Sequence, residues 1–149
     1  MQEHYHIKHK TFTVNDSLYR FYRDFENVSP WWINIVSVDK KTENGWEKVG
    51  ELNGLDSGQE SFHAQNRAFA MDQDSTGKIW MCFNLVEYLD NYFFKIYSCV
   101  IDSSDNCTFT EEYSERTFMF PEYRNVPLDL KITDDDEIFI SKLIYPNPR

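Results

Sequence analysis

The chain has 149 residues, enough for one domain with a substantial core, and 17% of them are aromatic. Fifteen lysines and arginines against 25 aspartates and glutamates leave a net charge of −10, so nucleic-acid phosphates would be repelled. No apolar run approaches the roughly 20 residues that span a bilayer, and the N-terminus lacks the basic-then-apolar order of a signal peptide. We therefore expect a cytoplasmic protein that binds neither nucleic acid directly nor a membrane.

Apolar and polar residues alternate loosely over residues 4–14, which predicts a first β-strand. The next segment has apolar side chains at the i, i+3, i+4 and i+7 positions of a short amphipathic helix: Leu18, Phe21, Tyr22 and Phe25. Asp16 or Ser17 could cap this N-terminal helix, and residues 27–30 would end it. The alternation through Leu18, Arg20 and Tyr22 leaves a strand as the alternative.

From residue 31 onward, segments rich in β-branched and aromatic residues alternate with turns. The predicted strands are residues 31–38, 62–71, 78–88, 92–101, 108–114, 128–132 and 138–145. Residues 117–127 contain two prolines, which restrict them to an edge strand or a loop. No linker divides the chain. We predict one all-β domain over residues 1–149, with roughly nine to eleven antiparallel strands in repeated hairpins and one short N-terminal helix.

Four of the predicted hairpins share a pattern in which an apolar strand leads into an acidic turn and then to an aromatic residue. The aromatic residues fall at intervals of 34, 29 and 30 (46 to 80, 80 to 109 and 109 to 139): Trp46, Trp80, Phe109 and Phe139. Such regular spacing indicates a small repetitive β body. We expect the aromatic residues to lie in the core and the acidic turns to lie along one rim.

Several residues could bind a metal, but each has a simpler interpretation. Residues 72–77 (Asp-Gln-Asp-Ser-Thr-Gly) have the order of the first half of a calcium loop. Phe83 stands where an EF-hand places its bidentate glutamate, so a tight hairpin turn is the preferred interpretation. His4, His6 and His9 have no carboxylate or thiolate at a spacing that suits zinc. We predict no metal and no cofactor.

Catalysis is not predicted either. His63 could act as a base, but no serine or cysteine lies in a nucleophile motif that would use it. The cysteines are odd in number and lie in or beside apolar strands, as reduced thiols do: Cys82, Cys99 and Cys107. The alternative to a protein-binding function is a small-ligand or glycan-binding β module that uses Trp31, Trp32 or Tyr123, with Trp80 as a further platform residue. A hydrolase that uses His63 is the third option.

The acidic turns indicate a docking surface for a positively charged partner. A solvated turn is the simpler interpretation of any one acidic stretch, but equivalent turns on one rim would add their fields. The predicted partner-binding carboxylates are Asp72, Asp74, Asp102, Asp105, Glu111, Glu112, Asp134, Asp135, Asp136 and Glu137. Tyr113 and Tyr123 would supply the aromatic anchors that binding hot spots favour.

Residues 70–80 (Ala-Met-Asp-Gln-Asp-Ser-Thr-Gly-Lys-Ile-Trp) resemble the strand–turn–strand of a β-propeller blade, where an Asp–Gly turn precedes an Ile-Trp pair. The chain has strands for two or three blades, so it resembles half a propeller. A small, acidic half-propeller is similar to the immunity proteins of bacterial contact-dependent growth inhibition systems. That resemblance implies a monomer that binds a cognate basic toxin, commonly a nuclease such as a ribonuclease, in a 1:1 complex and covers its active site.

Overall fold

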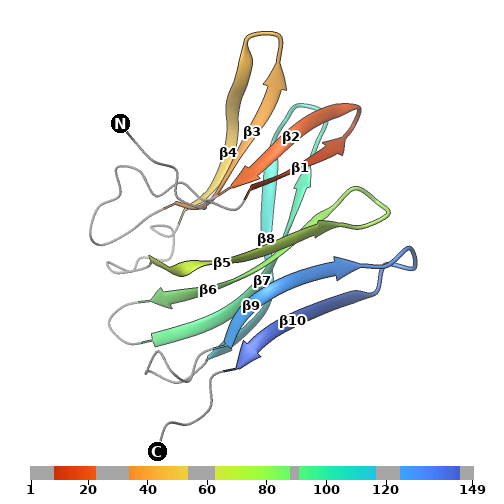
Figure 1. Cartoon of the computed structure of the whole chain (residues 1–149). Coiled ribbons are helices and arrows are strands. Elements are labelled where there is room, and N and C mark those ends of the chain that lie inside the picture. Colours follow the sequence, from red (N-terminus) through yellow and green to blue (C-terminus); the bar gives the residue numbers. More distant parts are fainter. Residues whose placement is uncertain (1–8, 23–33, 54–62, 88–90, 117–124, 145–149) are drawn as a thin grey trace, which may run out of the picture.

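The structure is a computed structural model that describes residues 9–22, 34–53, 63–87, 91–116 and 125–144. These residues form ten antiparallel strands and contain no helix (Figure 1). The strands are β1 (His9–Val14), β2 (Ser17–Tyr22), β3 (Asn34–Thr42), β4 (Gly45–Asn53), β5 (His63–Gln73), β6 (Ile79–Glu87), β7 (Asn91–Ile101), β8 (Cys107–Arg116), β9 (Asn125–Ile132) and β10 (Ile138–Ile144). The all-β prediction is confirmed. A helix long and apolar enough to cross a membrane is absent from these ranges.

Each of the three sheets is an antiparallel meander in which every strand pairs with the next strand along the chain. The strand orders are β1-β2-β3-β4, β5-β6-β7-β8 and β9-β10. Short hairpin connections favour this order because sequence neighbours meet first and need no crossover. Since strand direction alternates, the turns β1–β2 and β3–β4 lie at one end of the first sheet, and the turns β5–β6 and β7–β8 lie at one end of the second.

The N-terminal helix prediction is wrong where it overlaps β2. Asn15 and Asp16 have φ angles of 51° and 65°, the positive values of a two-residue type I′ turn, so the chain reverses immediately after β1. Tyr19 and Phe21 then point into the core, 1% and 0% exposed, whereas Leu18 is 38% exposed. Burial with a period of two therefore overrides the helical spacing of the apolar residues. The remainder of the predicted helix lies outside the described residues.

Two apolar clusters hold the three sheets together. The first lies between the two four-stranded sheets, and its members that are fully buried at 0% exposure are Phe21, Val36, Val38, Phe69, Ile79, Met81 and Phe83. The second lies on the other face of the β5–β8 sheet and consists of Ala70, Cys82, Phe94 and Leu130. Successive side chains of a strand point to opposite faces, so β5 and β6 contribute to both clusters. The β5–β8 sheet is therefore the middle layer.

The β5–β6, β7–β8 and β9–β10 hairpins end in the same five-residue turn, over residues 74–78, 102–106 and 133–137. The N–H of the first residue donates to the carbonyl of the fifth at 2.9, 3.0 and 2.9 Å, respectively. The fourth residue has a positive φ in each turn: 94° at Gly77, 68° at Asp105 and 64° at Asp136. The N–H of the fifth residue donates to the side chain of the first at 3.0 Å in all three. The sequence repeat is therefore a repeat of turn geometry.

The aromatic residues of the repeat do not occupy equivalent positions, so the prediction that they all lie in the core is wrong. Trp80 and Phe139 come six residues after the start of their turns (80 − 74 and 139 − 133), whereas Phe109 comes seven after (109 − 102). A one-residue shift turns a side chain to the other face of a sheet. Trp80 packs against the second cluster and Phe109 against the first. Phe139 is 58% exposed, and Trp46 stacks on the Arg20 guanidinium at 4.5 Å.

Candidate functional site

Four hairpin turns gather at one end of the stacked sheets, and we call them the turn rim: residues 15–16, 74–78, 102–106 and 133–137 (Figure 1). Hydrogen bonds connect them. Asn15 Nδ2 donates to the carbonyl of Ile101 at 3.1 Å, and Gln73 at the end of β5 donates to the backbone of β1 at 2.9 Å. The Ser75 N–H donates to Asp136 Oδ1 at 2.8 Å. The acidic turns therefore share one rim, as repeated hairpins would require.

The turn rim is strongly acidic. Its segments carry one basic residue, Lys78, and eight carboxylates: Asp16, Asp74, Asp102, Asp105, Asp134, Asp135, Asp136 and Glu137. Two further lysines with polar contacts lie just outside these segments, at Lys10 and Lys40. Carboxylates concentrated on one end of a molecule create a negative potential that extends into solvent over about 8–10 Å at physiological ionic strength.

Two of the predicted carboxylates hold the β5–β6 hairpin and its neighbour in place. Asp72 Oδ2 accepts the Ile132 N–H at 2.8 Å, which ties β9 to β5. Asp74 Oδ2 accepts the Trp80 Nε1–H at 2.9 Å, and its Oδ1 accepts hydrogen bonds from Thr76 within the turn. Burial alone would raise the pKa of Asp74, but the bonds from Thr76, Trp80 and the Lys78 backbone outweigh it and lower that pKa. Residues 72–77 thus form a tight hairpin turn.

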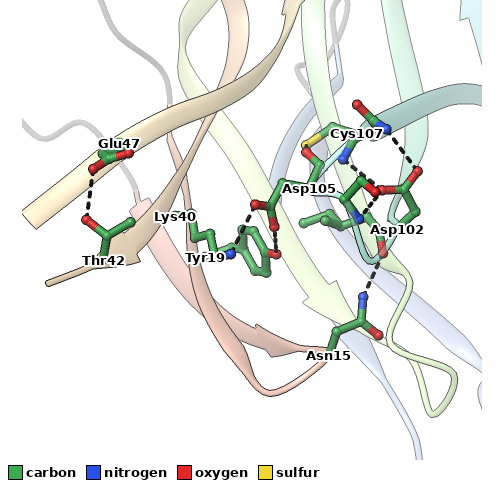
Figure 2. Close-up of polar contacts among 11 residues, drawn as sticks. Asn15, Tyr19, Lys40, Thr42, Glu47, Asp102, Asp105 and Cys107 are labelled. Atoms are coloured by element: carbon green, nitrogen blue, oxygen red, sulfur yellow. Dashed lines mark hydrogen bonds and ion pairs between the residues drawn. The ribbon is translucent and has the colours of Figure 1, made fainter.

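Asp105 connects the second sheet to the first (Figure 2). Its Oδ1 accepts the Tyr19 hydroxyl at 2.5 Å, and its Oδ2 lies 3.0 Å from Lys40 Nζ. These contacts lower the pKa of the Asp105 carboxyl, the Tyr19 hydrogen bond contributing most and Lys40 next. The neighbouring Asp102 accepts the backbone N–H groups of Asn106 and Ser104, which lower its pKa as well. Both carboxylates are therefore occupied by the fold.

The hydrogen bond between Tyr19 and Asp105 also affects how the Tyr19 hydroxyl titrates at alkaline pH. Burial, followed by the hydrogen bond to Asp105, raises the pKa of Tyr19 from 10.0 to about 12. A raised folded pKa means that the stabilisation is complete below pH 10 and is lost as the pH rises toward about 12. Of the nine tyrosines, Tyr19 should therefore ionise late in a tyrosinate absorbance titration. Tyr19→Phe should remove that late step and Tyr113→Phe should leave it; a late step that survives Tyr19→Phe contradicts the assignment.

The β9–β10 turn carries three open carboxylates of the rim. Asp136 accepts both the N–H and the hydroxyl of Ser75, at 2.8 and 2.5 Å. Within the described part of the chain, by contrast, the side chains of Asp134, Asp135 and Glu137 have no hydrogen bond or ion pair, and all three are exposed. Of the carboxylates predicted to bind a partner, these three are available without breaking an internal contact.

Glu111 and Glu112 lie in the middle of β8 and are not part of the turn rim, so their grouping with the acidic turns is corrected. The register shifts between Ile96 and Tyr97 and leaves Glu112 as an extra residue opposite β7, a β-bulge. Glu111 pairs with the buried Lys95 at 2.6 Å, and Glu112 accepts the Ser98 hydroxyl at 2.6 Å. Both therefore stabilise an edge strand.

A cleft that the sequence did not predict lies between β7–β8 and β10. It has a volume of about 220 Å³ and is lined by Phe94, Ile96, Tyr113, Ile140 and Lys142. Lys142 Nζ lies 4.4 Å above the Phe94 ring and 3.7 Å from a Glu115 carboxylate oxygen at the mouth. Tyr113, predicted as a binding anchor, is 46% exposed in its wall. Residues on separate hairpins form this cleft, so local sequence patterns carry no signal for it.

Some predicted residues cannot be placed. Tyr123, Trp31 and Trp32 lie outside the described residues, and of His63 only the backbone, at the start of β5, is described. The glycan platform and the hydrolase therefore stay predictions. In the described ranges no group of three or more histidine, cysteine, aspartate or glutamate side chains is arranged to hold a metal ion.

Comparison with known proteins leaves the site to be interpreted from its own geometry. No protein-family model matches the sequence, and no curated protein matches it significantly.

Proposed function

We propose that this protein captures a basic protein partner at the turn rim. The observation that carries the proposal is that four turns from three sheets converge at one end and place eight carboxylates there against a single lysine, Lys78. Complementary charge accelerates encounter and orients the partner, because it acts beyond contact distance. Nothing in this mechanism requires catalysis, a cofactor or a metal.

The internal contacts of the rim divide its carboxylates between two roles. Asp74, Asp102 and Asp105 keep the turns in shape, since their oxygens accept hydrogen bonds from the turns or from β2, β3 and β6. Asp134 and Asp135 project from a turn that Asp136 anchors to Ser75. A fixed turn that presents free carboxylates loses little conformational entropy on binding. We therefore place the first contact with the partner at the β9–β10 turn.

The protein class that fits this role best is an immunity protein of the contact-dependent growth inhibition type, cytoplasmic and monomeric when free. Its partner would be a basic toxin, a nuclease for instance, whose active site it covers in a 1:1 complex. Face-to-face meander sheets of four, four and two strands support a half-propeller arrangement in which each sheet is a blade or part of one. The class is testable by co-expression with a basic, toxin-like product of a neighbouring reading frame. A stable 1:1 complex and restored growth are expected; growth arrest without a complex contradicts it.

Neutralising two open carboxylates of the rim tests the docking surface itself. Asp134→Asn with Asp135→Asn should slow association with the toxin-like partner about threefold to tenfold at low salt and weaken the salt dependence, because long-range attraction is reduced. The measurement is the association rate at two ionic strengths. Glu51→Gln near the far end of β4 with Glu115→Gln near the far end of β8 changes the net charge equally, from −10 to −8, and should have little effect. Equal slowing by both pairs would assign the effect to net charge rather than to the rim.

The cleft favours a second candidate function, the binding of a small apolar ligand. It has a volume of about 220 Å³ and is open to solvent, so it could hold a ring-sized apolar group with one side exposed. Three of its lining side chains are apolar, and Lys142 could pair with an acidic group of the ligand at the mouth. NMR titration with benzoate should shift resonances of Phe94 and Ile140 in the wild type and not in Tyr113→Trp, which fills the cleft. Unchanged resonances in the wild type would leave the rim as the working surface.

A further inference from the structure

Two cysteines face each other diagonally across the β7–β8 hairpin. Cys107 on β8 lies directly opposite Ile101 on β7, and Cys99 is two residues before Ile101 on the same strand. The two thiols therefore lie on the same face of the sheet, as diagonal neighbours. Both belong to or pack against the first apolar cluster. Cys82 belongs to the second cluster, on the other face. The hairpin therefore brings together two of the three thiols and excludes the third.

The two thiols differ in access to solvent. Cys99 is buried, 1% exposed, whereas Cys107 is half-buried at the start of β8, directly after the turn rim. Cys107 Sγ lies 3.9 Å from the carbonyl of Asp105 (Figure 2). On its other side is the bare backbone of Gly50 in β4, where an added Cβ would be 2.8 Å from the sulfur. Cys107 is therefore the more accessible of the two cysteines.

The contact between the thiols makes them chemically different. The interaction between the two neighbouring thiols lowers the pKa of Cys107 and raises that of Cys99. Burial and the nearby carboxylates of Asp105 and Asp102 act in the opposite direction on Cys107, but the interaction with Cys99 outweighs them. The thiolate is the form that reacts with oxidants. An accessible thiol with raised thiolate content next to a second thiol is the arrangement of a redox-sensitive cysteine pair.

We propose that Cys107 is a peroxide-reactive cysteine and that Cys99 resolves its oxidised form into a disulfide. The Cys107 thiolate attacks hydrogen peroxide, so that an S–O bond forms, the O–O bond breaks and hydroxide leaves. The Cys99 sulfur then gives up its proton and attacks Cys107; the S–S bond forms as the S–O bond breaks, and the second oxygen leaves as water. Two thiols and one peroxide give one disulfide and two waters, with peroxide as the oxidant.

Sheet geometry makes this disulfide readily reversible. Diagonal Cα atoms of an antiparallel pair lie roughly 7–8 Å apart, whereas disulfides favour roughly 4.4–6.8 Å. The ends of β7 and β8 must therefore approach each other, by on the order of 1 Å, and a bond formed under such constraint is more easily reduced. The movement occurs beside Asp105, which joins this turn to Tyr19 and Lys40. Oxidation would therefore change the geometry of the turn rim.

Mass spectrometry of the folded chain after brief treatment with dilute hydrogen peroxide tests the pair. In the wild type the count of free thiols should fall from three to one, and peptide mapping should find Cys99 linked to Cys107. Dithiothreitol should restore three. Cys99→Ala should instead accumulate a Cys107 sulfenic acid that dimedone traps. Cys107→Ala should oxidise at least about tenfold more slowly, and Cys82→Ala should behave as the wild type.

Circular dichroism of each variant shows that it is folded before treatment. A disulfide that includes Cys82, or Cys99→Ala that yields no dimedone adduct, overturns the proposal. So does a Cys107 that oxidises no faster than the cysteine of an unstructured peptide at the same pH. None of these readouts involves a binding partner, so their outcome is independent of the proposed function.

Discussion

Leu130→Ala should lower the free energy of unfolding by about 2–5 kcal/mol, the range for truncating a buried leucine. Leu130 is 0% exposed and is the residue of β9 that enters the second cluster, against Ala70, Cys82 and Phe94. The cluster is small, so little apolar surface can close around the cavity that the substitution leaves. The hydrogen bond from the Ile132 N–H to the Asp72 carboxylate is partly exposed to water and contributes no more than about 1.5–3 kcal/mol.

Urea denaturation followed by tryptophan fluorescence measures this effect, because Trp80 packs against the same cluster. Phe139→Ala is the matched control: it removes a larger side chain from the same hairpin, but one that is 58% exposed. That variant should change stability by no more than about 0.5 kcal/mol. Equal effects of the two substitutions would show that β9–β10 is not anchored by Leu130. A separate early transition in Leu130→Ala would show that the hairpin detaches before the other two sheets unfold.

Asp105→Ala should destabilise the fold by about 2–4 kcal/mol. The substitution leaves the hydroxyl of Tyr19, a residue only 1% exposed, without its acceptor and removes the partner of Lys40. A hydrogen bond to a charged group contributes about 1.5–3 kcal/mol. An alanine at the φ of 68° adds about 1 kcal/mol of backbone strain, since only glycine, asparagine and aspartate enter this region readily.

Asp136→Ala separates the contribution of the lost hydrogen bonds from that of the backbone strain. Asp136 occupies the same turn position with a φ of 64°, but within the described ranges its carboxylate bonds only the exposed Ser75. Thermal and urea denaturation should therefore show Asp105→Ala to be less stable than Asp136→Ala by at least about 1 kcal/mol. A double-mutant cycle of Asp105→Asn with Tyr19→Phe should give a coupling energy of about 1 kcal/mol or more. If the two substitutions had additive effects on stability, this would contradict an interaction between Asp105 and Tyr19 that connects the two sheets.

The pH dependence of the same pair follows from the lowered pKa of Asp105. Since the folded pKa lies below the unfolded value of about 3.9, the stabilisation is complete above that pH and is lost as the pH falls through the folded pKa. The stability difference between wild type and Asp105→Asn should therefore be constant from roughly pH 5 to 8 and shrink below about pH 4.

Much of the architecture was predictable because it is encoded locally. Residues 79–83 are uninterrupted by polar side chains and form a strand that is buried on both faces, within the middle layer. Gly77 takes the positive φ that its turn needs. The prediction of a helix over β2 was wrong because the apolar residues of this segment fit both a helical stripe and a strand. Local spacing alone cannot distinguish the two. The type I′ turn at Asn15 and Asp16 made that choice.

The candidate site was predictable only in its chemical character. Acidic turns at regular spacing implied an acidic rim, and the four turns do meet at one end of the sheets (Figure 1). Whether a carboxylate is free to bind a partner depends on residues far away in the chain. Asp105 is hydrogen-bonded to Tyr19, 86 residues away, and Asp136 to Ser75, 61 residues away. The Phe94–Lys142 cleft and the contact of Cys107 with Gly50 also join residues far apart in the chain, so local sequence patterns did not predict them.

Strand alternation and turn chemistry act over a few neighbouring residues, so they are enough to predict an acidic, antiparallel β protein whose turns carry negative charge. Which of those charges face solvent depends on how the sheets pack against one another. Asp105 is held by Tyr19 and Lys40 from the other sheet, whereas Asp134 and Asp135 meet no partner in the described chain. The physical reason is that a carboxylate's hydrogen-bond donors are supplied by packing, and packing joins elements that the sequence keeps apart.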